Sequence, residues 1–361
     1  MSPSAAVVVC DIFPPEVGGM ASTAARVSRY LTINATPAVT LVFKADRITR
    51  HFSNTVKSFP TDKILTSFNR QAEYREEWQQ IIPLAVEPSF VISLYMGRPA
   101  YMGHLLARLL WVPHYIVCLG SDVNHHFERF VHKWRFPWLI KCAKRIGILS
   151  PDMRDKFRSF SDSDGKITLL SPGYDTASFF PMDVPIEYDI LFVGRARPVK
   201  GLDRLVTALS KITRSARVCC VIPVNDADAA FAATYRETAA RKASHHSFVW
   251  LPQQTPIELR QLYNASRFVV VPSRSEGAPH VVLEAMACNR PVIAADVGRI
   301  AEFLGSCKTL FTTDEDLERL LAAVVDETLD VPTNLRRQAL AIANQNDECT
   351  AFRRFVDLED E

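Results

Sequence analysis

The chain has 361 residues, which is too many for one small hydrophobic core and suits two domains. Hydrophobic residues make up 48% and charged residues 23% of it, as in ordinary globular proteins. The formal net charge of +2 gives no sign of a protein that binds nucleic acid, so nucleic acid is not among the expected partners.

The cysteines and the apolar runs bear on the cellular compartment. The eight cysteines include no CxxC pair, and several lie in apolar runs, as buried free thiols do. This pattern favours a reducing compartment and gives no support to a zinc site. The amino terminus has no basic segment, and no stretch approaches the roughly 20 apolar residues of a membrane-spanning helix. We therefore expect a cytoplasmic protein.

Strands and helices alternate along the first half of the chain. Short apolar runs predict strands, and amphipathic stretches between them predict helices. Strands are expected at residues 5–10, 38–43, 90–94, 114–119, 146–149 and 166–170, and helices at 21–31, 61–82, 100–110 and 151–160. This alternation predicts a parallel sheet with helices on both faces.

One segment of the first half mixes basic and aromatic residues. His126 to Arg145 reads HFERFVHKWRFPWLIKCAKR, with Glu128 as its one acidic residue. Such a mixture suits an anionic membrane surface, because aromatic rings lie at headgroup depth and cations bind phosphates. Nucleic acid would satisfy the same chemistry, and a core-packing helix with a solvated basic face is an equal alternative. Membrane contact would place the protein peripherally on the inner face of the membrane.

The second half repeats the alternation of strands and helices. Strands are expected at residues 188–193, 217–223, 248–251, 268–271 and 291–295, and helices at 203–211, 256–264, 281–288, 300–304, 317–328, 335–345 and 348–358. We expect an amino-terminal domain over residues 1–180, a short linker, and a second domain over 188–345. Residues 346–361 are expected to form a helix that crosses back to the first domain.

Two loops of the second half follow buried strands and carry charge. The loop from Gly194 to Leu202 contains Arg195, Arg197 and Lys200, and such cations suit a diphosphate. A second loop holds Glu276 followed by small residues, and Glu284 lies in the helix after it. Ligands bind beyond the carboxyl ends of strands in open α/β sheets, and helix starts favour anions. Two carboxylates beside an anion-binding turn suggest a nucleotide-sugar, although Glu284 alone could be a solvated helix residue.

The stretch PSRSEGAPHVVLEAMACNRPVIAADVG, from Pro272 to Gly298, resembles the donor-binding signature of the retaining glycosyltransferases of family 4, which have the GT-B fold. The loop with Arg195 and Lys200 resembles the same family's diphosphate-binding loop, whereas Arg197 lies outside the pattern and is expected to be solvated. Asn289 stands where the family usually has glycine at a helix end, and asparagine also tolerates a left-handed cap.

The resemblance implies an α/β fold of two Rossmann-like domains whose parallel sheets face an interdomain cleft. It implies catalytic roles for Glu276, Arg195 and Lys200, and a ribose contact for Glu284. Further donor contacts would come from Gly18, Gly19, Leu251, Gly277, Ala278 and Pro279. First domains of this fold bind the acceptor, so Glu16 and Asp122 are acceptor-side candidates; Asp122 could equally be a helix cap.

The resulting hypothesis is a retaining, metal-independent glycosyltransferase. It would move a sugar from a UDP- or GDP-sugar to a glycan, lipid-linked or small-molecule acceptor, without a cofactor. The alternatives are a non-catalytic nucleotide-sugar-binding protein and a sugar-nucleotide epimerase of the same fold. Asp162-Ser163-Asp164 and Asp226-Ala227-Asp228 spell the DxD metal motif of the other large glycosyltransferase fold, but short acidic triplets are common in loops, so no metal role is expected for them.

Overall fold

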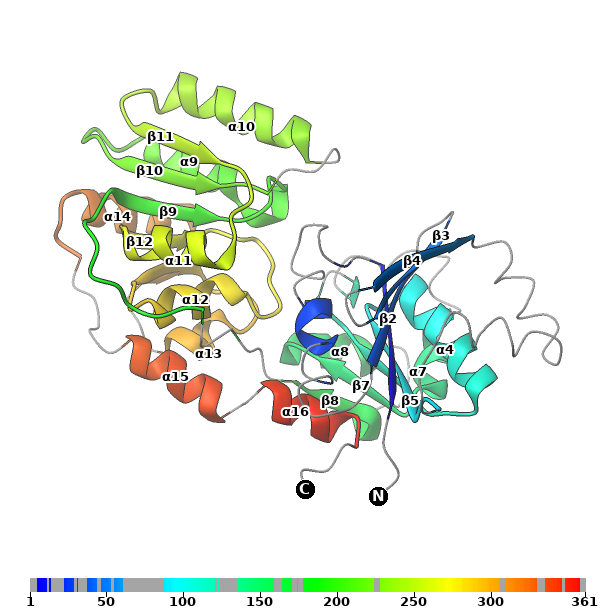
Figure 1. The fold of residues 1–361 in the computed structure, drawn as a ribbon. Helices are drawn as coiled ribbons and strands as arrows, with labels where there is room; N and C mark the ends of the chain where they lie inside the picture. Colours follow the sequence, from blue (N-terminus) through cyan, green and yellow to red (C-terminus); the bar gives the residue numbers. More distant parts are fainter. Residues whose placement is uncertain are drawn as a thin grey trace. The chain divides into compact units, whose positions relative to one another are not determined.

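The computed structural model divides the chain into two compact units (Figure 1). One unit contains Met1–Ser171 and Cys349–Glu361, and the other contains Pro172–Glu348. The structure describes residues 5–11, 13, 23–28, 31, 38–43, 47–52, 55–60, 87–120, 122–123, 135–158, 164–170, 174, 178–223, 228–305, 309–329, 335–345 and 348–357. Within these residues the predicted alternation of strands and helices is confirmed, and each unit is a Rossmann-like α/β domain. The helix predicted at residues 61–82 lies outside the described residues.

The sheet of the first unit has eight strands in the order β4-β3-β2-β1-β5-β6-β7-β8. Its parallel strands are β1 (Ala6–Cys10), β2 (Ala38–Phe43), β5 (Phe90–Leu94), β6 (His114–Val117), β7 (Arg145–Ile148) and β8 (Ile167–Leu169). The expectation of a wholly parallel sheet is wrong at one edge, because β3 (Arg47–Phe52) and β4 (Thr55–Pro60) pair antiparallel. These two strands are polar in sequence and lack the apolar run that marks a buried strand.

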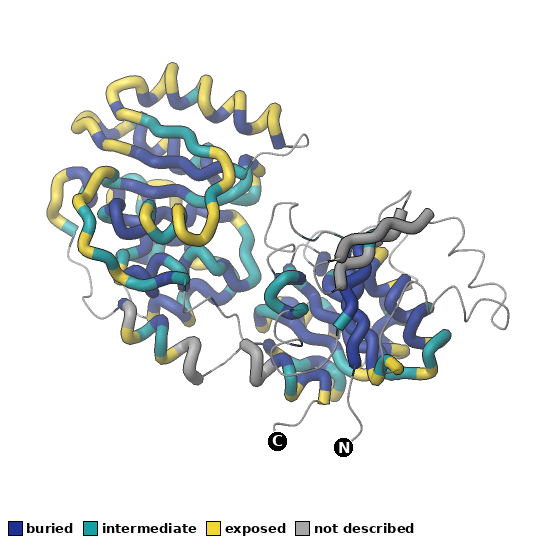
Figure 2. The backbone as a smooth tube through the Cα atoms, in the orientation of Figure 1, coloured by how far each residue is buried: buried dark blue, intermediate teal, exposed yellow. Residues whose placement is uncertain are grey.

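Strands β1, β5 and β6 are buried on both faces, as their apolar sequences predict, whereas Leu169 of the edge strand β8 is 40% exposed (Figure 2). Helices α4 (Arg98–Leu110), α7 (Arg135–Cys142) and α8 (Pro151–Arg158) belong to the same unit. Helix α7 lies in the segment that mixes basic and aromatic residues, of which residues 126–134 fall outside the described part. Phe136, Leu139 and Ile140 of α7 are buried in a core cluster, so this half of the segment packs as a core helix.

The last described helix, α16 (Glu348–Phe355), completes the core of the first unit. Phe352, Phe355 and Val356 are at most 3% exposed and belong to the same apolar cluster as β1 and β5. Just after the helix, the carboxylate of Asp357 accepts a hydrogen bond from the Tyr115 hydroxyl at 2.7 Å and pairs with Arg145 at 2.6 Å. The carboxyl terminus is therefore part of the amino-terminal unit.

The sheet of the second unit has six parallel strands in the order β11-β10-β9-β12-β13-β14. They are β9 (Tyr188–Val193), β10 (Arg217–Val221), β11 (Ser247–Leu251), β12 (Ser266–Val271), β13 (Val292–Ala295) and β14 (Leu310–Phe311). From β9 the chain builds outward through β10 and β11, and from β12 it builds the other way. The border between β9 and β12 is thus the topological switch point, where ligands bind in such sheets.

The helices of this unit are α9 (Leu202–Leu209), α10 (Ala229–Lys242), α11 (Pro256–Asn264), α12 (His280–Ala287), α13 (Ile300–Leu304), α14 (Asp314–Val325) and α15 (Leu335–Gln345). Buried residues of α9, α10 and α14 form one apolar cluster with the strands. Helix α11 begins with a complete capping box, in which Thr255 and Glu258 satisfy each other's backbone N–H groups. This cap explains why its bounds follow from the sequence alone.

Candidate active site

The charged loops predicted from the sequence follow neighbouring strands of the second unit. The loop with Arg195 and Lys200 follows β9, and the loop with Glu276 follows β12. Because β9 and β12 are adjacent and parallel, both loops leave the sheet at the same edge, at the switch point. Leu251, the last residue of β11, lies at the same edge.

The loop after β9 turns sharply into α9. Pro198–Lys200 form one 3₁₀ turn, and Gly201 follows with φ +69°. A side chain at Gly201 would place its Cβ 1.9 Å from the Pro272 carbonyl oxygen, at the end of β12. Only glycine satisfies both the left-handed backbone and this close approach. Lys200 is thereby held beside the loop that follows β12.

Lys200 and Glu276 meet across the switch point. Lys200 Nζ lies 2.6 Å from Glu276 Oε1, and the Ser273 hydroxyl donates a hydrogen bond to the same oxygen at 2.7 Å. The Glu276 side chain is 10% exposed and that of Lys200 is 31% exposed, so the pair lies at the mouth of the site. The structure thus joins a cation and a carboxylate that are 76 residues apart in the chain.

Arg274 and Gly298 hold the loop of Glu276 in place. The backbone N–H of Arg274 donates to the Val199 carbonyl at 2.8 Å, and its guanidinium binds Asp203 through two hydrogen bonds. A Cβ at Gly298 would lie 2.4 Å from the Glu276 carbonyl oxygen. The backbone after β13 therefore packs directly against the backbone of the Glu276 loop. Neither support could be predicted from the sequence, because contacts between separate loops leave no local signal in it.

Arg195 is bound by a residue that the sequence analysis set aside. The carboxylate of Asp228, at the start of α10, lies 2.6 Å from Arg195 Nε and 2.8 Å from Arg197 Nε. The Asp228 side chain is only 1% exposed. From the sequence, Asp228 was considered only as part of a metal motif and this pairing was not predicted, and Arg197, although 47% exposed, is paired rather than simply solvated. An unpaired carboxylate at this depth would be strongly disfavoured.

Glu284 lies in the second turn of α12 and has a buried partner. The Tyr263 hydroxyl donates a hydrogen bond to Glu284 Oε2 at 2.8 Å. Tyr263 is fully buried, and burial together with the neighbouring Glu284 charge holds the pKa of its phenol well above the usual value. The phenol therefore stays a donor and fixes the position of the carboxylate.

The small residues before α12 leave the helix start open. Pro279 precedes the first turn, and no side chain caps it. Gly277 is half-buried, and Ala278 and Pro279 are buried. At the other end of the helix Asn289 has φ +58°, which confirms the predicted left-handed cap.

The acceptor-side candidates belong to the first unit. Asp122 is fully buried, and its carboxylate accepts hydrogen bonds from the backbone N–H groups of Met96, Leu119, Gly120 and Val123. Burial raises the pKa of its carboxyl group, and these hydrogen bonds oppose the rise. This geometry favours the local structural alternative, since the carboxylate organises the loop after β6. Glu16, Gly18 and Gly19 lie outside the described residues.

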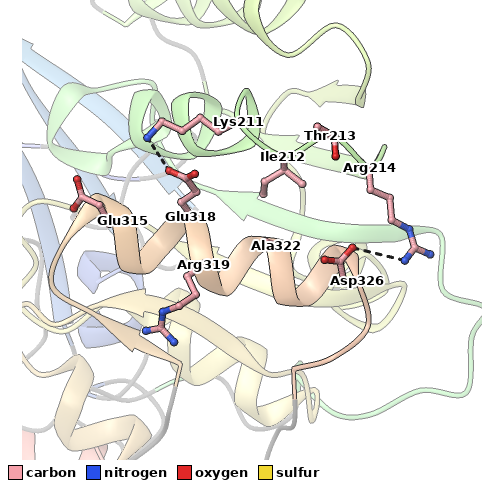
Figure 3. Close-up of a pocket in the computed structure, with 9 residues that line it drawn as sticks. All are labelled: Lys211, Ile212, Thr213, Arg214, Glu315, Glu318, Arg319, Ala322 and Asp326. Carbon is pink, nitrogen blue, oxygen red and sulfur yellow. Dashed lines mark hydrogen bonds and ion pairs between the residues drawn. The ribbon is translucent and has the colours of Figure 1, made fainter.

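Two cavities of the second unit lie beside charged side chains. One, of about 430 Å³, is lined by Ser273, Arg274, Asp296 and Asp314 at the carboxyl ends of β13 and β14. The other, of about 400 Å³, lies between the end of α9 and α14 (Figure 3). Its Lys211–Glu318 and Arg214–Asp326 pairs join the segment after α9 to α14 and belong to neither loop of the site. These pairs therefore serve as controls for the charges of the site.

The described ranges contain neither a cluster of metal-ligand residues nor a membrane-spanning helix. No three His, Cys, Asp or Glu side chains come together there as a metal site would require. Every described helix is too short or too polar to cross a bilayer.

Sequence comparisons match the unit that carries this geometry. Residues 184–345 match the model of the family Glycosyl transferases group 1. A D-inositol 3-phosphate glycosyltransferase from Segniliparus rotundus is 30% identical over 188 residues, covering 49% of this chain and 42% of the relative. One from Nocardia farcinica is 33% identical over 178 residues, covering 45% and 40%. The chain thus matches less than half of the length of these relatives.

Solved structures resemble the whole chain. Sucrose-phosphate synthase from Thermosynechococcus elongatus has a TM-score of 0.72 and 17% identity, with 98% of both chains covered. The Anabaena protein HepE in complex with UDP-glucose has a TM-score of 0.73 and 13% identity, again with 98% of both chains covered. These likenesses confirm the expected two-domain GT-B fold. The second unit of the chain accordingly carries a domain that matches the group 1 glycosyl transferases.

Proposed function

We propose that the protein is a retaining, metal-independent glycosyltransferase that moves a sugar from a UDP- or GDP-sugar to a glycan, lipid-linked or small-molecule acceptor. One observation carries the proposal: Lys200 and Glu276 meet at the switch point of a domain that matches the group 1 glycosyl transferases. Arg195 lies on the loop of Lys200, and Glu284 lies on the helix after Glu276. Each residue type suits one part of a nucleotide-sugar.

The cations suit the leaving group of the reaction. As the bond to the sugar breaks, negative charge develops on the nucleoside diphosphate, and the sugar becomes cationic in character. Arg195, Lys200 and the open start of α12 would stabilise the diphosphate, which is the task that a metal ion performs in other enzymes. One well-placed group of this kind is typically worth about 3 kcal/mol of transition-state stabilisation.

The carboxylates suit the sugar and the ribose. Glu276 would orient the donor sugar through its hydroxyls, and Glu284, held by Tyr263, would accept hydrogen bonds from the ribose. Glu276 and Lys200 neutralise each other in their ion pair. Donor binding would give each a new partner, a hydroxyl for Glu276 and a phosphate for Lys200. Because Glu276 is the one carboxylate that we assign to the donor sugar, we expect attack from the leaving-group face, which retains the configuration, rather than double displacement.

The similar proteins support this assignment in part. HepE has been solved with UDP and with UDP-glucose, and the relatives in Segniliparus and Nocardia are named D-inositol 3-phosphate glycosyltransferases. We propose a nucleotide-sugar donor for this chain on that basis. Donors with either base and acceptors with or without a phosphate belong in the first screen.

Substitution of the charged pair tests the proposal. Lys200→Ala and Glu276→Ala are expected to lower kcat by about 100- to 1,000-fold or more, because each removes a group that acts on the donor. Lys211→Ala is the matched control, since Lys211 forms a similar ion pair with Glu318 outside the two loops of the site. Donor consumption in the presence of a screened acceptor is the measurement.

The same assay decides between the proposal and its alternatives. Full activity of Lys200→Ala or Glu276→Ala would contradict the proposed roles. Donor binding without turnover would point to a sensor, and epimerised donor without transfer would point to an epimerase. Proton NMR of the product is expected to show the donor's anomeric configuration, and EDTA is expected to leave the rate unchanged.

We also propose that the first unit contacts an anionic membrane surface, through a face defined by α4 and α7. Trp111 at the end of α4 is 93% exposed, and Tyr101 and Trp138 lie with ring centroids 6.4 Å apart and are 38% and 39% exposed. Neither helix contains Asp or Glu, and the exposed cations on them are Arg98, Arg108 and Lys141. Exposed aromatics among unopposed cations suit a headgroup layer.

Vesicle sedimentation tests this membrane proposal. Trp111→Ser with Lys141→Glu is expected to release the protein from vesicles that contain phosphatidylserine, and vesicles of phosphatidylcholine alone are expected to bind neither form. Phe231→Ser with Lys242→Glu on α10 of the second unit is the control. Unchanged binding of the first variant would exclude this face.

A further inference from the structure

Two arginines and one buried carboxylate form a cluster at the carboxyl ends of β9 and β10. The Asp228 side chain is 1% exposed, and its Oδ2 and Oδ1 atoms lie 2.6 Å and 2.8 Å from the Nε atoms of Arg195 and Arg197. The arginine side chains are 23% and 47% exposed. The Asp228 carboxylate thus pairs with two partly exposed arginines of the same loop.

The way in which Asp228 binds the arginines sets their direction. A guanidinium carries five N–H donors in one plane, and Asp228 takes the Nε donor of each arginine with a separate oxygen. The edge formed by the two terminal nitrogens lies on the side opposite Nε. Both forks are therefore directed away from Asp228 and are fixed as a pair on the loop that also holds Lys200.

The charges of the cluster suit a diphosphate. Arg195, Arg197 and Lys200 bring three positive charges, and Asp228 and Glu276 bring two negative ones, which leaves one positive charge. A guanidinium fork matches the oxygens of one phosphoryl group, and a diphosphate presents two such groups. A pair of forks side by side is a better match to it than one fork and a flexible ammonium.

We infer that Arg197 is a second diphosphate-binding arginine and that Asp228 is the positioning residue that presents Arg195 and Arg197 together. The inference rests on the proposed function and adds two residues to it. Arg197 lies outside the family pattern, and Asp228 is 31 and 33 residues from its partners in the chain. The pairing is visible only in the folded domain.

Nucleotide binding to the full chain tests Arg197. Titration calorimetry with UDP, UMP, GDP and GMP is expected to show that the wild-type protein prefers a diphosphate. Arg197→Ala is expected to weaken binding of that diphosphate by about 10-fold or more and to leave the monophosphate within about twofold, because a charge-assisted hydrogen bond to the second phosphoryl group is lost. Arg197→Lys, which keeps the charge without the fork, is expected to fall between. Arg241→Ala, on the exposed last turn of α10, is the matched control.

Asp228→Asn tests the positioning role. Loss of orientation is expected to weaken diphosphate binding by about 10-fold with little change for the monophosphate. If Asp228 acted only as a counter-charge, its neutralisation would strengthen diphosphate binding. If it only anchored α10, both nucleotides would weaken together as the melting temperature falls. Either of these results overturns the positioning role of Asp228. Arg197→Ala tests the diphosphate-binding role of Arg197 even where Asp228→Asn fails to fold.

The wild-type measurement separates this inference from the proposed function. Absence of binding to UDP and to GDP would overturn the proposed function and the inference with it. A wild-type preference for the diphosphate that Arg197→Ala retains in full would overturn the inference alone.

Discussion

Single residues of this protein show how burial decides protonation. His114 is 3% exposed, and its Nε2 lies 2.8 Å from the Ser93 hydroxyl oxygen. The Ser93 hydroxyl donates its proton to the Pro99 carbonyl at 2.9 Å, so His114 is the donor to Ser93. The other ring nitrogen, Nδ1, is buried without a partner among the described residues. A second proton would have to occupy that atom.

The ring of His114 therefore links stability to pH. Burial, with a smaller contribution from His104, lowers the pKa of His114 from 6.5 to about 3. Below pH 6.5 the unfolded chain binds a proton that the folded chain refuses, so stability falls as the pH falls toward 3. The free energy of unfolding is expected to be about 2 kcal/mol lower at pH 5 than at pH 7 from this group.

Urea titrations at pH 7 and pH 5 measure this loss. Tryptophan fluorescence reports mainly on the first unit, because Trp250 alone of the five tryptophans belongs to the second. His114→Gln keeps a donor for Ser93 but does not titrate, and it is expected to show a smaller difference between the two pH values. Equal differences in the two proteins would contradict the assignment.

At the scale of elements, the sequence predicts strands and helices that one continuous stretch forms, and it misses contacts between residues that are far apart in the chain. The predicted bounds of β5, β9 and α11 are confirmed by the structure, which also shows the capping box at the start of α11. Strands β3 and β4 were missed because their polar sequences carry no burial signal. Lys200 and Glu276 were identified through loops that follow strands, whereas Asp228 was missed because neither its burial nor its partners can be read from an acidic triplet.

The turn between β9 and α9 gives a prediction for an element. Gly201→Ala forces an alanine into φ +69° and drives its Cβ against the Pro272 carbonyl oxygen. We expect a loss of at least about 1–2 kcal/mol from the backbone strain alone, and weaker binding of UDP or GDP because Lys200 moves with the turn. Melting temperature and nucleotide titration are the measurements.

Gly165→Ala provides the control for this turn. Its Cβ would meet no atom within 4 Å, so both quantities are expected to remain near the wild-type values. Wild-type stability and affinity in Gly201→Ala would show that the close approach to β12 is not needed.

At the scale of the whole molecule, one unit is formed by a single chain segment and the other by two segments. The second unit is continuous from Pro172 to Glu348, whereas the first needs Cys349–Glu361 as well. Phe355 is 1% exposed in the core of the first unit, and its ring lies 5.6 Å from that of Tyr115. The match to the group 1 glycosyl transferases covers residues 184–345 and leaves the first unit outside it.

Phe355→Ala is expected to destabilise the first unit and spare the second. Loss of a buried phenylalanine typically costs about 3–5 kcal/mol. Tryptophan fluorescence is expected to show an earlier transition in urea, while hydrogen exchange of peptides from β9 and β12 stays unchanged. Phe231→Ala, at a 42% exposed position on α10, is the control. Parallel loss of protection in both units would contradict independent cores.

Because α16 packs in the core of the first unit, the order of synthesis on the ribosome determines when each unit can finish folding. Residues 172–348 are all available before the segment that finishes the earlier-made unit has emerged. The first unit is thus begun before the second and completed after it, and nascent chains that stop at residue 347 are expected to leave it open to protease. Emergence of the segment from residue 349 onward is the event that closes it.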